Sequence, residues 1–164
     1  MKGATVDSSA AGAAGSGIRM NAKVATTLVT GDSAGAREDA IAALLDAVHA
    51  SPAVLPDVLP DSHKPSGAAA ARPGLDSAVI LEGMAASSTP LVSTPSLQVV
   101  RIAPGCLCCD GNLVLRVTLN RLLRQRPQRL YIGLARSEHL DQLRSWLQDA
   151  PYDQLLALNP VLDT

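Results

Sequence analysis

The sequence predicts a three-layer α/β fold, in which a mostly parallel β-sheet carries helices on both faces. Apolar runs of strand length alternate with amphipathic segments of helical spacing, and glycine or proline punctuates the boundaries. Strands that alternate with helices form parallel sheets covered on both faces. At 164 residues the chain is long enough for one such domain with its own core.

The first element is expected to be a strand over 23–30, because its β-branched residues (KVATTLVT) favour extended backbone. A turn follows at Gly31, and then a helix that ends before Pro52. The helix has apolar residues at spacings of three and four, and these are Ile41, Leu44, Leu45 and Val48.

The second half of the chain contains four further expected strands and two further expected helices. The strands cover 75–81, 97–102, 129–132 and 154–162, the last weakened by Pro160. The helices cover 111–125, with Asp110 as the N-cap, and 137–149.

Two segments are expected to lack fixed structure. Residues 1–22 form an Ala/Gly/Ser-rich tail that cannot bury enough apolar area to order itself, and either Met1 or Met20 could be the start. Residues 51–76 contain five prolines and an alanine run, which predict a flexible segment inside the domain at 23–164.

Composition excludes several function classes. The formal net charge is -1 and only 2% of residues are aromatic, which argues against nucleic acid as a partner. No apolar run approaches the roughly 20 residues of a membrane span, so no membrane association is expected. The N-terminus lacks the apolar core of a secretory signal, and the clustered thiols suit a reducing compartment, so a cytoplasmic location is expected.

All three cysteines of the chain, Cys106, Cys108 and Cys109, lie within four residues. They follow an expected strand and precede an expected helix, whose N-terminus stabilises thiolate charge. Soft thiolates in a C-x-C-C array suit Zn²⁺ or Cu(I). We therefore expect a metal site, most simply for Zn²⁺, with redox sensing or burial as small hydrophobic residues as the alternatives.

A fourth ligand must come from outside the cysteine cluster. The candidates are His139, His49, His63, Glu82, water or a second subunit. His139 is the first choice, because it follows another expected strand at the same edge of the sheet.

The order of these features resembles the CobW family of P-loop GTPases and metallochaperones, as a shortened and degenerate member. In that family a glycine-rich phosphate loop follows the first strand, and GC-x-CC follows a later strand and precedes a helix. Residues 105–109 read GCLCC here, and the resemblance extends over 23–164. It implies a P-loop-like nucleotide-binding domain, a metal ion as cargo, and a client metalloprotein or a complete CobW-like relative as partner.

The phosphate loop departs from the family pattern at residues 31–38. Gly31 matches, but Ala34 and Ala36 replace glycines, Arg37 replaces the lysine, and Glu38 replaces the Mg²⁺-binding hydroxyl. A Cβ obstructs the close approach of backbone amides to phosphate, and a carboxylate repels it. Gly31 and Arg37 are therefore expected to be vestiges of a phosphate loop, with GTP and Mg²⁺ not expected to bind. A plain turn followed by a helix with acidic first-turn residues is the alternative.

The carboxylate that serves Mg²⁺ and water in the family is also absent, because Gly133 directly follows the strand at 129–132. Glu82 is expected to be a solvated charge at a strand end. Loss of these parts argues against GTP hydrolysis. The leading hypothesis is a metal-binding, metallochaperone-like protein; an active GTPase and a metal-free interaction module are the alternatives.

Overall fold

The computed structural model describes residues 22–50, 75–85, 88–103, 113–138 and 140–164. Apart from Ala22, the expected tail over 1–22 lies outside these ranges, and so does the expected flexible segment over 51–76 apart from Leu75 and Asp76.

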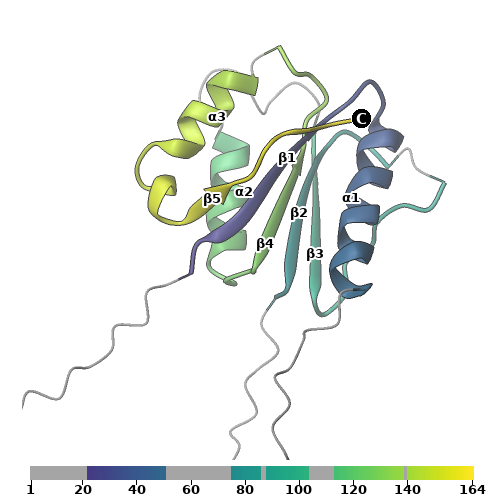
Figure 1. Cartoon of the computed structure of the whole chain (residues 1–164), viewed down its shortest axis with the longest axis horizontal. Coiled ribbons are helices and arrows are strands. Elements are labelled where there is room, and N and C mark those ends of the chain that lie inside the picture. The colour runs from purple at the N-terminus through teal and green to yellow at the C-terminus, as the bar shows by residue number, and fades with distance from the viewer. Residues whose placement is uncertain (1–21, 51–74, 86–87, 104–112, 139) are drawn as a thin grey trace, which may run out of the picture.

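The described residues form a three-layer α/β fold, as expected (Figure 1). The strands are β1 (Val24–Thr30), β2 (Ser77–Glu82), β3 (Leu97–Ile102), β4 (Arg129–Gly133), β5 (Leu156–Leu158) and β6 (Leu162–Asp163). Their order in the sheet is β3-β2-β4-β1-β5, and β6 also pairs with β1. Every pairing among these strands is parallel.

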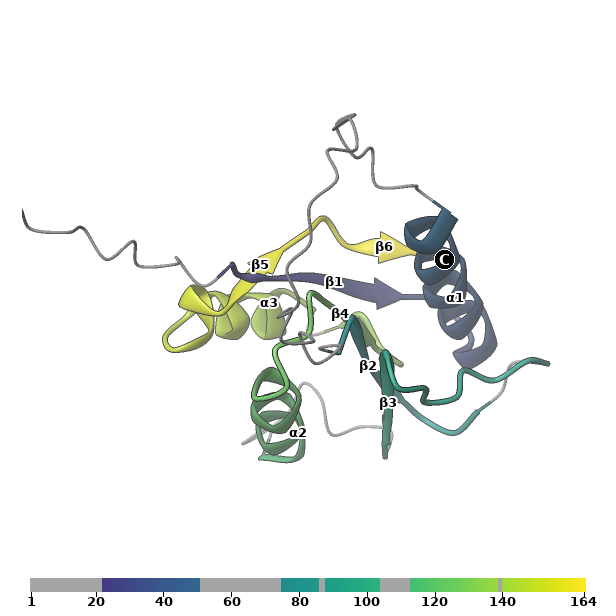
Figure 2. The same ribbon diagram turned by 90° about the horizontal axis from the view of Figure 1, so that it is seen from below.

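Helices cover both faces of the sheet (Figure 2). The helix α1 (Ala34–Ala50) packs through Ile41 and Leu45 onto one face, while α2 (Leu113–Leu123) and α3 (Leu140–Gln148) cover the other. Alternate residues of each strand point to opposite faces, so Leu28 and Val29 of β1 belong to different clusters. The layers are therefore held by two separate aliphatic cores.

Gly133 lies where side chains of β2 and α1 come close to β4. A Cβ there would lie 2.8 Å from Cδ2 of Leu81 and 3.5 Å from Cδ1 of Ile41. The first distance is shorter than Cβ contacts normally are, so a larger residue would force the Leu81 side chain to move, whereas the contact with Ile41 is an ordinary one.

Most element boundaries agree with those expected from the sequence. The strand at 97–102 is reproduced, and β1, β2 and β4 differ by one or two residues at an end. The helix expected over 111–125 ends at Leu123, and its expected cap Asp110 lies outside the described residues. The helix expected over 137–149 begins only at Leu140.

The continuous strand expected over 154–162 is wrong. A short 3-10 helix, η1 (Tyr152–Gln154), precedes β5, and Asn159, Pro160 and Val161 separate β5 from β6. Asn159 still donates its backbone amide to the Thr26 carbonyl at 2.8 Å. Pro160 has no amide to donate, so the ladder stops there and resumes at β6.

Within the ranges that the structure describes, no helix is long and apolar enough to cross a membrane.

The two faces of α2 provide a test of the packing. Leu119 is fully buried among the residues of the larger core, whereas Val117, two residues earlier, is 59% exposed. We expect Leu119→Ala to lower the free energy of unfolding by about 2–5 kcal/mol through lost burial and an unfilled cavity. The matched control Val117→Ala should change it by less than about 0.5 kcal/mol, as surface substitutions usually do. Urea denaturation measures both values, and equal losses would contradict this packing of α2.

Candidate functional site

Because all strands are parallel, their carboxyl ends share one edge of the sheet. Both segments singled out in the sequence begin there, since Gly31 follows β1 and Ala103 follows β3. The strands β2 and β4 lie between β1 and β3, so the two segments start about 14 Å apart. The groups that fill this gap determine what the edge can bind.

The turn between β1 and α1 is shorter than the phosphate loop considered for residues 31–38. Only Gly31, Asp32 and Ser33 separate the two elements, and Ala34 is already helical. The hydroxyl of Ser33 accepts the backbone amide of Ala36 at 3.0 Å, which caps the helix. The Arg37 amide donates to the Ser33 carbonyl at 3.2 Å. The amides of Ala36 and Arg37 are therefore used within the turn and the helix.

The side chain of Arg37 faces the protein interior and is only 4% exposed. Its Nη1 donates to the Gly31 carbonyl at 2.7 Å, so the structure does bring together the two residues expected as a vestigial phosphate loop. Burial lowers the pKa of the Arg37 guanidinium, and the negative charge of Glu82 partly offsets that effect. The guanidinium remains charged at neutral pH and stabilises its own turn.

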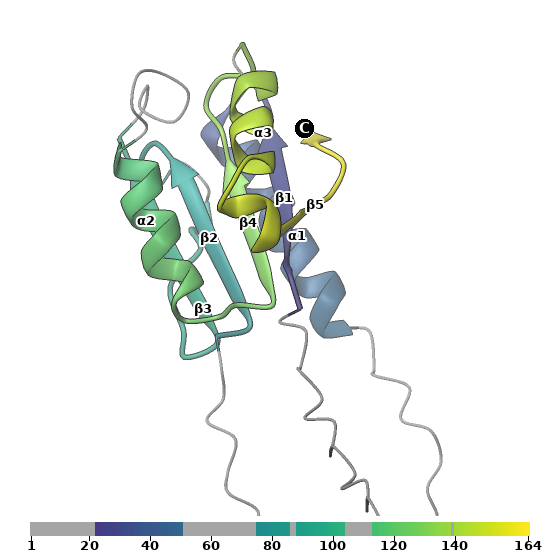
Figure 3. The ribbon, with the colours of Figure 1, turned by 90° about the vertical axis from the view of Figure 1, so that its left-hand side faces the viewer.

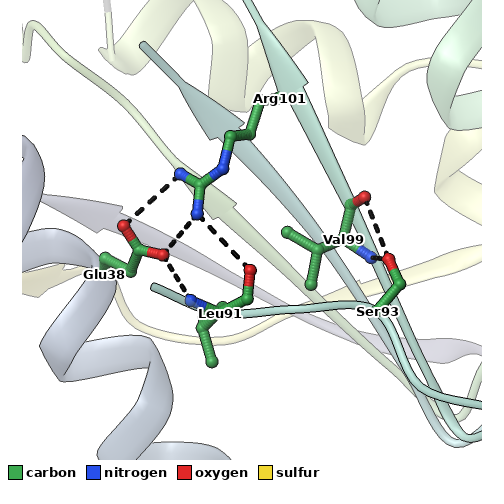
Figure 4. A network of polar contacts seen from close by, with 5 residues as sticks. All are labelled: Glu38, Leu91, Ser93, Val99 and Arg101. Atoms are coloured by element: carbon green, nitrogen blue, oxygen red, sulfur yellow. Dashed lines mark hydrogen bonds and ion pairs between the residues drawn. The ribbon is translucent and has the colours of Figure 1, made fainter. Parts of the chain in front are cut away.

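Glu38 is also buried, with an exposed fraction of 1%. Its Oε1 accepts a hydrogen bond from the Leu91 amide at 2.6 Å and forms an ion pair with Nη2 of Arg101 (Figure 4). Its Oε2 accepts a hydrogen bond from Nη1 of Arg101 at 3.4 Å. The sequence suggested that this carboxylate would repel a phosphate at the turn, or would lie in the first turn of α1. The expectation of an acidic first turn is wrong, because α1 has no acidic residue there and Glu38 points across the sheet to β3.

Residues 91–94 run beside β3 and cover part of its outer edge (Figure 4). The Ser93 hydroxyl accepts the Val99 amide at 2.9 Å, and the amide of Thr94 donates to the Leu97 carbonyl at 2.8 Å. This segment gives the edge strand some of the partners that a neighbouring strand would supply. The Glu38–Leu91 bond then fastens the segment to α1.

Glu82 ends β2 and is 6% exposed, so the expectation of a solvated strand-end charge is wrong. Its Oε2 accepts the Ala135 amide at 2.8 Å, which ties the end of β2 to the residues after β4. A carboxylate therefore stands at this edge although Gly133 supplies none. This carboxylate is that of Glu82 on the neighbouring strand β2, and its negative charge raises the pKa of Arg37.

The expected metal ligands Cys106, Cys108 and Cys109 lie outside the described residues, as do His139 and His63. Covalent geometry limits the Cα of Cys106 to about 11 Å from that of Ala103. In the part of the chain that the structure describes, no three His, Cys, Asp or Glu side chains are grouped to hold a metal.

The two described candidates for a fourth ligand differ in position. Glu82 pairs in register with Ile102, one residue before Ala103, so it lies beside the start of the cysteine segment. His49 lies in the last turn of α1, about 22 Å along the helix axis from Ala34, and its Nδ1 contacts the Leu45 carbonyl at 2.6 Å. His49 therefore belongs to the opposite end of the molecule.

A shallow cavity of about 400 Å³ lies at the carboxyl ends of β2 and β3. Its lining consists of Gly83, Met84, Ala85, Arg101, Ile102 and Ala103. Gly83 has a φ of +106°, a conformation in which side chains are strained, and it turns the chain away from the sheet after Glu82. The cavity thus borders the point where the chain leaves β3 toward the cysteines.

Sequence reasoning missed the pairing of Arg101 with Glu38. The available signal was a single charge inside the apolar strand LQVVRI, which requires an opposite charge if it is buried. Nothing in the spacing of residues 38 and 101 identifies the partner, because the contact joins α1 to β3 across 63 positions of sequence.

No family model, no curated protein and no solved structure matches this chain.

The ion pair at this edge can be tested by substitution. We expect Glu38→Gln to lower the free energy of unfolding by about 2–3 kcal/mol, because it leaves the Arg101 guanidinium partly buried without its counterion. Asp46→Asn, at an exposed position of the same helix, should change it by less than about 0.5 kcal/mol. In an Arg101→Met background the cost of Glu38→Gln should shrink or change sign. Equal costs in the two backgrounds would disprove the coupling.

Proposed function

We propose that this chain is a metal-binding, metallochaperone-like protein that holds Zn²⁺ through Cys106, Cys108 and Cys109 on a GTPase-like α/β domain. The observation that carries the proposal is the position of the three cysteines in the sequence. All three fall between the carboxyl end of β3 and the start of α2. Parallel α/β sheets bind their ligands at that edge.

Four charged side chains described at this edge leave no excess positive charge for a phosphate. Arg37 and Arg101 are balanced by Glu38 and Glu82, so these four side chains sum to zero. Three thiolates placed beside them would need a cation to offset their mutual repulsion, and Zn²⁺ prefers such ligands. Glu82 is the described candidate for a fourth ligand at this edge, through a carboxylate that also accepts the Ala135 amide.

An active GTPase is the second candidate function, and the turn after β1 argues against it. A triphosphate needs free backbone amides and a cation directed at it. Here the helix begins at Ala34, Ser33 caps it, and Arg37 donates to its own backbone. We therefore propose that the chain does not hydrolyse GTP. Saturable binding of a fluorescent GTP analogue in the presence of Mg²⁺ would reverse this part of the proposal.

A metal-free interaction module is the third candidate. In that case a complete CobW-like relative would be the partner, and the cysteines would be dispensable for binding it. The leading proposal instead takes a client metalloprotein as partner and the cytoplasm as location, since reduced thiols bind Zn²⁺.

A titration of the reduced, metal-free protein with Zn²⁺ against a chromophoric chelator tests the proposal. We expect one tightly bound Zn²⁺ per chain, with affinity that rises with pH because the thiols must lose protons to bind. Cys106→Ser should abolish this binding. The control His49→Ala should not change it, because His49 lies at the far end of α1. Absence of stoichiometric binding by the unmodified chain would refute the proposal.

Metal should also stabilise the fold by mass action, since it binds the folded chain in preference to the unfolded one. We expect Cys108→Ser to lower the melting temperature only when Zn²⁺ is present, as differential scanning fluorimetry would show. An equal decrease in the melting temperature of the metal-free protein would contradict the prediction, because Cys108 would then stabilise the fold without the metal.

A further inference from the structure

The solvent side of α2 carries apolar residues where a surface helix normally carries polar ones. Leu113 is 68% exposed, Val114 50% and Val117 59%. The buried stripe of the same helix, Leu115, Leu119 and Leu122, points to the opposite side. A helical segment that is apolar all round is normally covered on both sides. Figures 2 and 3 show α2 at the outside of the molecule, with the sheet and α3 on its inner sides.

The second half of this outer face is cationic. At 100° per residue, Leu113, Val117 and Arg121 fall within one outward sector of about 80°. Arg124 directly follows α2, and its amide still donates to the Asn120 carbonyl at 3.3 Å, so it continues this row. Residues 113–137 contain six arginines and no acidic residue, although the whole chain has a formal net charge of -1. The exposed members, Arg116, Arg121, Arg124 and Arg126, form no ion pair with any described residue. We call the surface formed by Leu113, Val114, Val117, Arg121 and Arg124 the α2 face.

The order of apolar and cationic residues along the α2 face favours one kind of partner over the others that could cover it. In a symmetric pair of α2 helices, a parallel arrangement sets arginines against arginines, and an antiparallel one sets them against valines and leucines. A helix lying on a membrane keeps one side apolar along its whole length, whereas here Arg121 and Arg124 interrupt that side. Nucleic acid gains little from an aliphatic patch without aromatic residues. A protein segment with aliphatic side chains followed by carboxylates satisfies both halves of the face.

We propose that the α2 face is a docking surface for an acidic amphipathic segment of another protein. Aliphatic side chains of that segment cover Leu113, Val114 and Val117, and its carboxylates pair with Arg121 and Arg124. The guanidinium fork favours carboxylates as bidentate partners. This inference does not depend on metal binding by the cysteines.

A pair of synthetic helical peptides tests the proposal with the full-length chain. One peptide carries leucines on the first half of one face and glutamates on the second half, and the other carries lysine in place of each glutamate. Fluorescence anisotropy should show saturable binding of the acidic peptide alone, weakened by salt. Arg121→Glu combined with Arg124→Glu should lower the affinity about tenfold or more, and so should Leu113→Ser combined with Val117→Ser.

The charge-matched control is Arg136→Glu combined with Arg144→Glu, at two positions outside the α2 face, which should leave the affinity unchanged. Urea denaturation of each variant confirms that it is folded, and exposed positions make large losses of stability unexpected. No binding of the acidic peptide, or equal binding by wild type and both double variants, overturns the proposal.

Three other results would assign the α2 face to a different occupant and also overturn the proposal. Sedimentation as a dimer that Val117→Ser dissolves would indicate a second copy of the chain. Binding to anionic vesicles that requires the same residues would indicate a lipid surface. Tighter peptide binding after Asp57→Asn and Asp61→Asn would indicate the chain's own apolar and acidic segment, VLPDVLPD at 54–61.

Discussion

The buried carboxylate of Glu38 holds together three parts of the molecule that are distant in sequence. From the second turn of α1 it reaches Arg101 near the end of β3 and the amide of Leu91 in the segment beside that strand. A charge buried to this degree is tolerated only when its hydrogen bonds and its counterion are in place. The position of α1, the path of residues 91–94 and the end of β3 are therefore fixed together. Whatever follows β3 starts from a defined point.

The same edge has the arrangement of a parallel α/β ligand site, but the groups around its first turn are not arranged to bind a phosphate. A parallel sheet brings its strand ends together whatever their sequence, and evolution can fill that edge with different groups. Here Ser33 caps α1, Arg37 bonds to its own turn, and Glu82 accepts the amide of Ala135. These three side chains therefore have partners within the chain.

Local pattern was enough to predict the fold class and most of the elements. Periodicity identified β3 to the residue, and proline placed the ends of helices, because both effects act over a few neighbouring residues. The break between β5 and β6 was missed, since QLLALNPVL contains enough apolar residues for one strand and only the ladder with β1 shows where Pro160 interrupts it. The site was less predictable. Glu38 and Glu82 looked like surface charges because their partners, Arg101 and the Ala135 amide, are brought near only by the tertiary fold.

The central claim is that the three thiolates beside this edge bind one metal ion. Cobalt substitution tests it most directly, because Co²⁺ takes the same ligands as Zn²⁺ and its thiolate bonds give a charge-transfer absorption that water or carboxylate ligands do not. The account predicts that this band saturates at one Co²⁺ per chain and is lost when Cys106 is replaced by serine. A spectrum without thiolate charge transfer, or one unchanged by these replacements, would contradict the account.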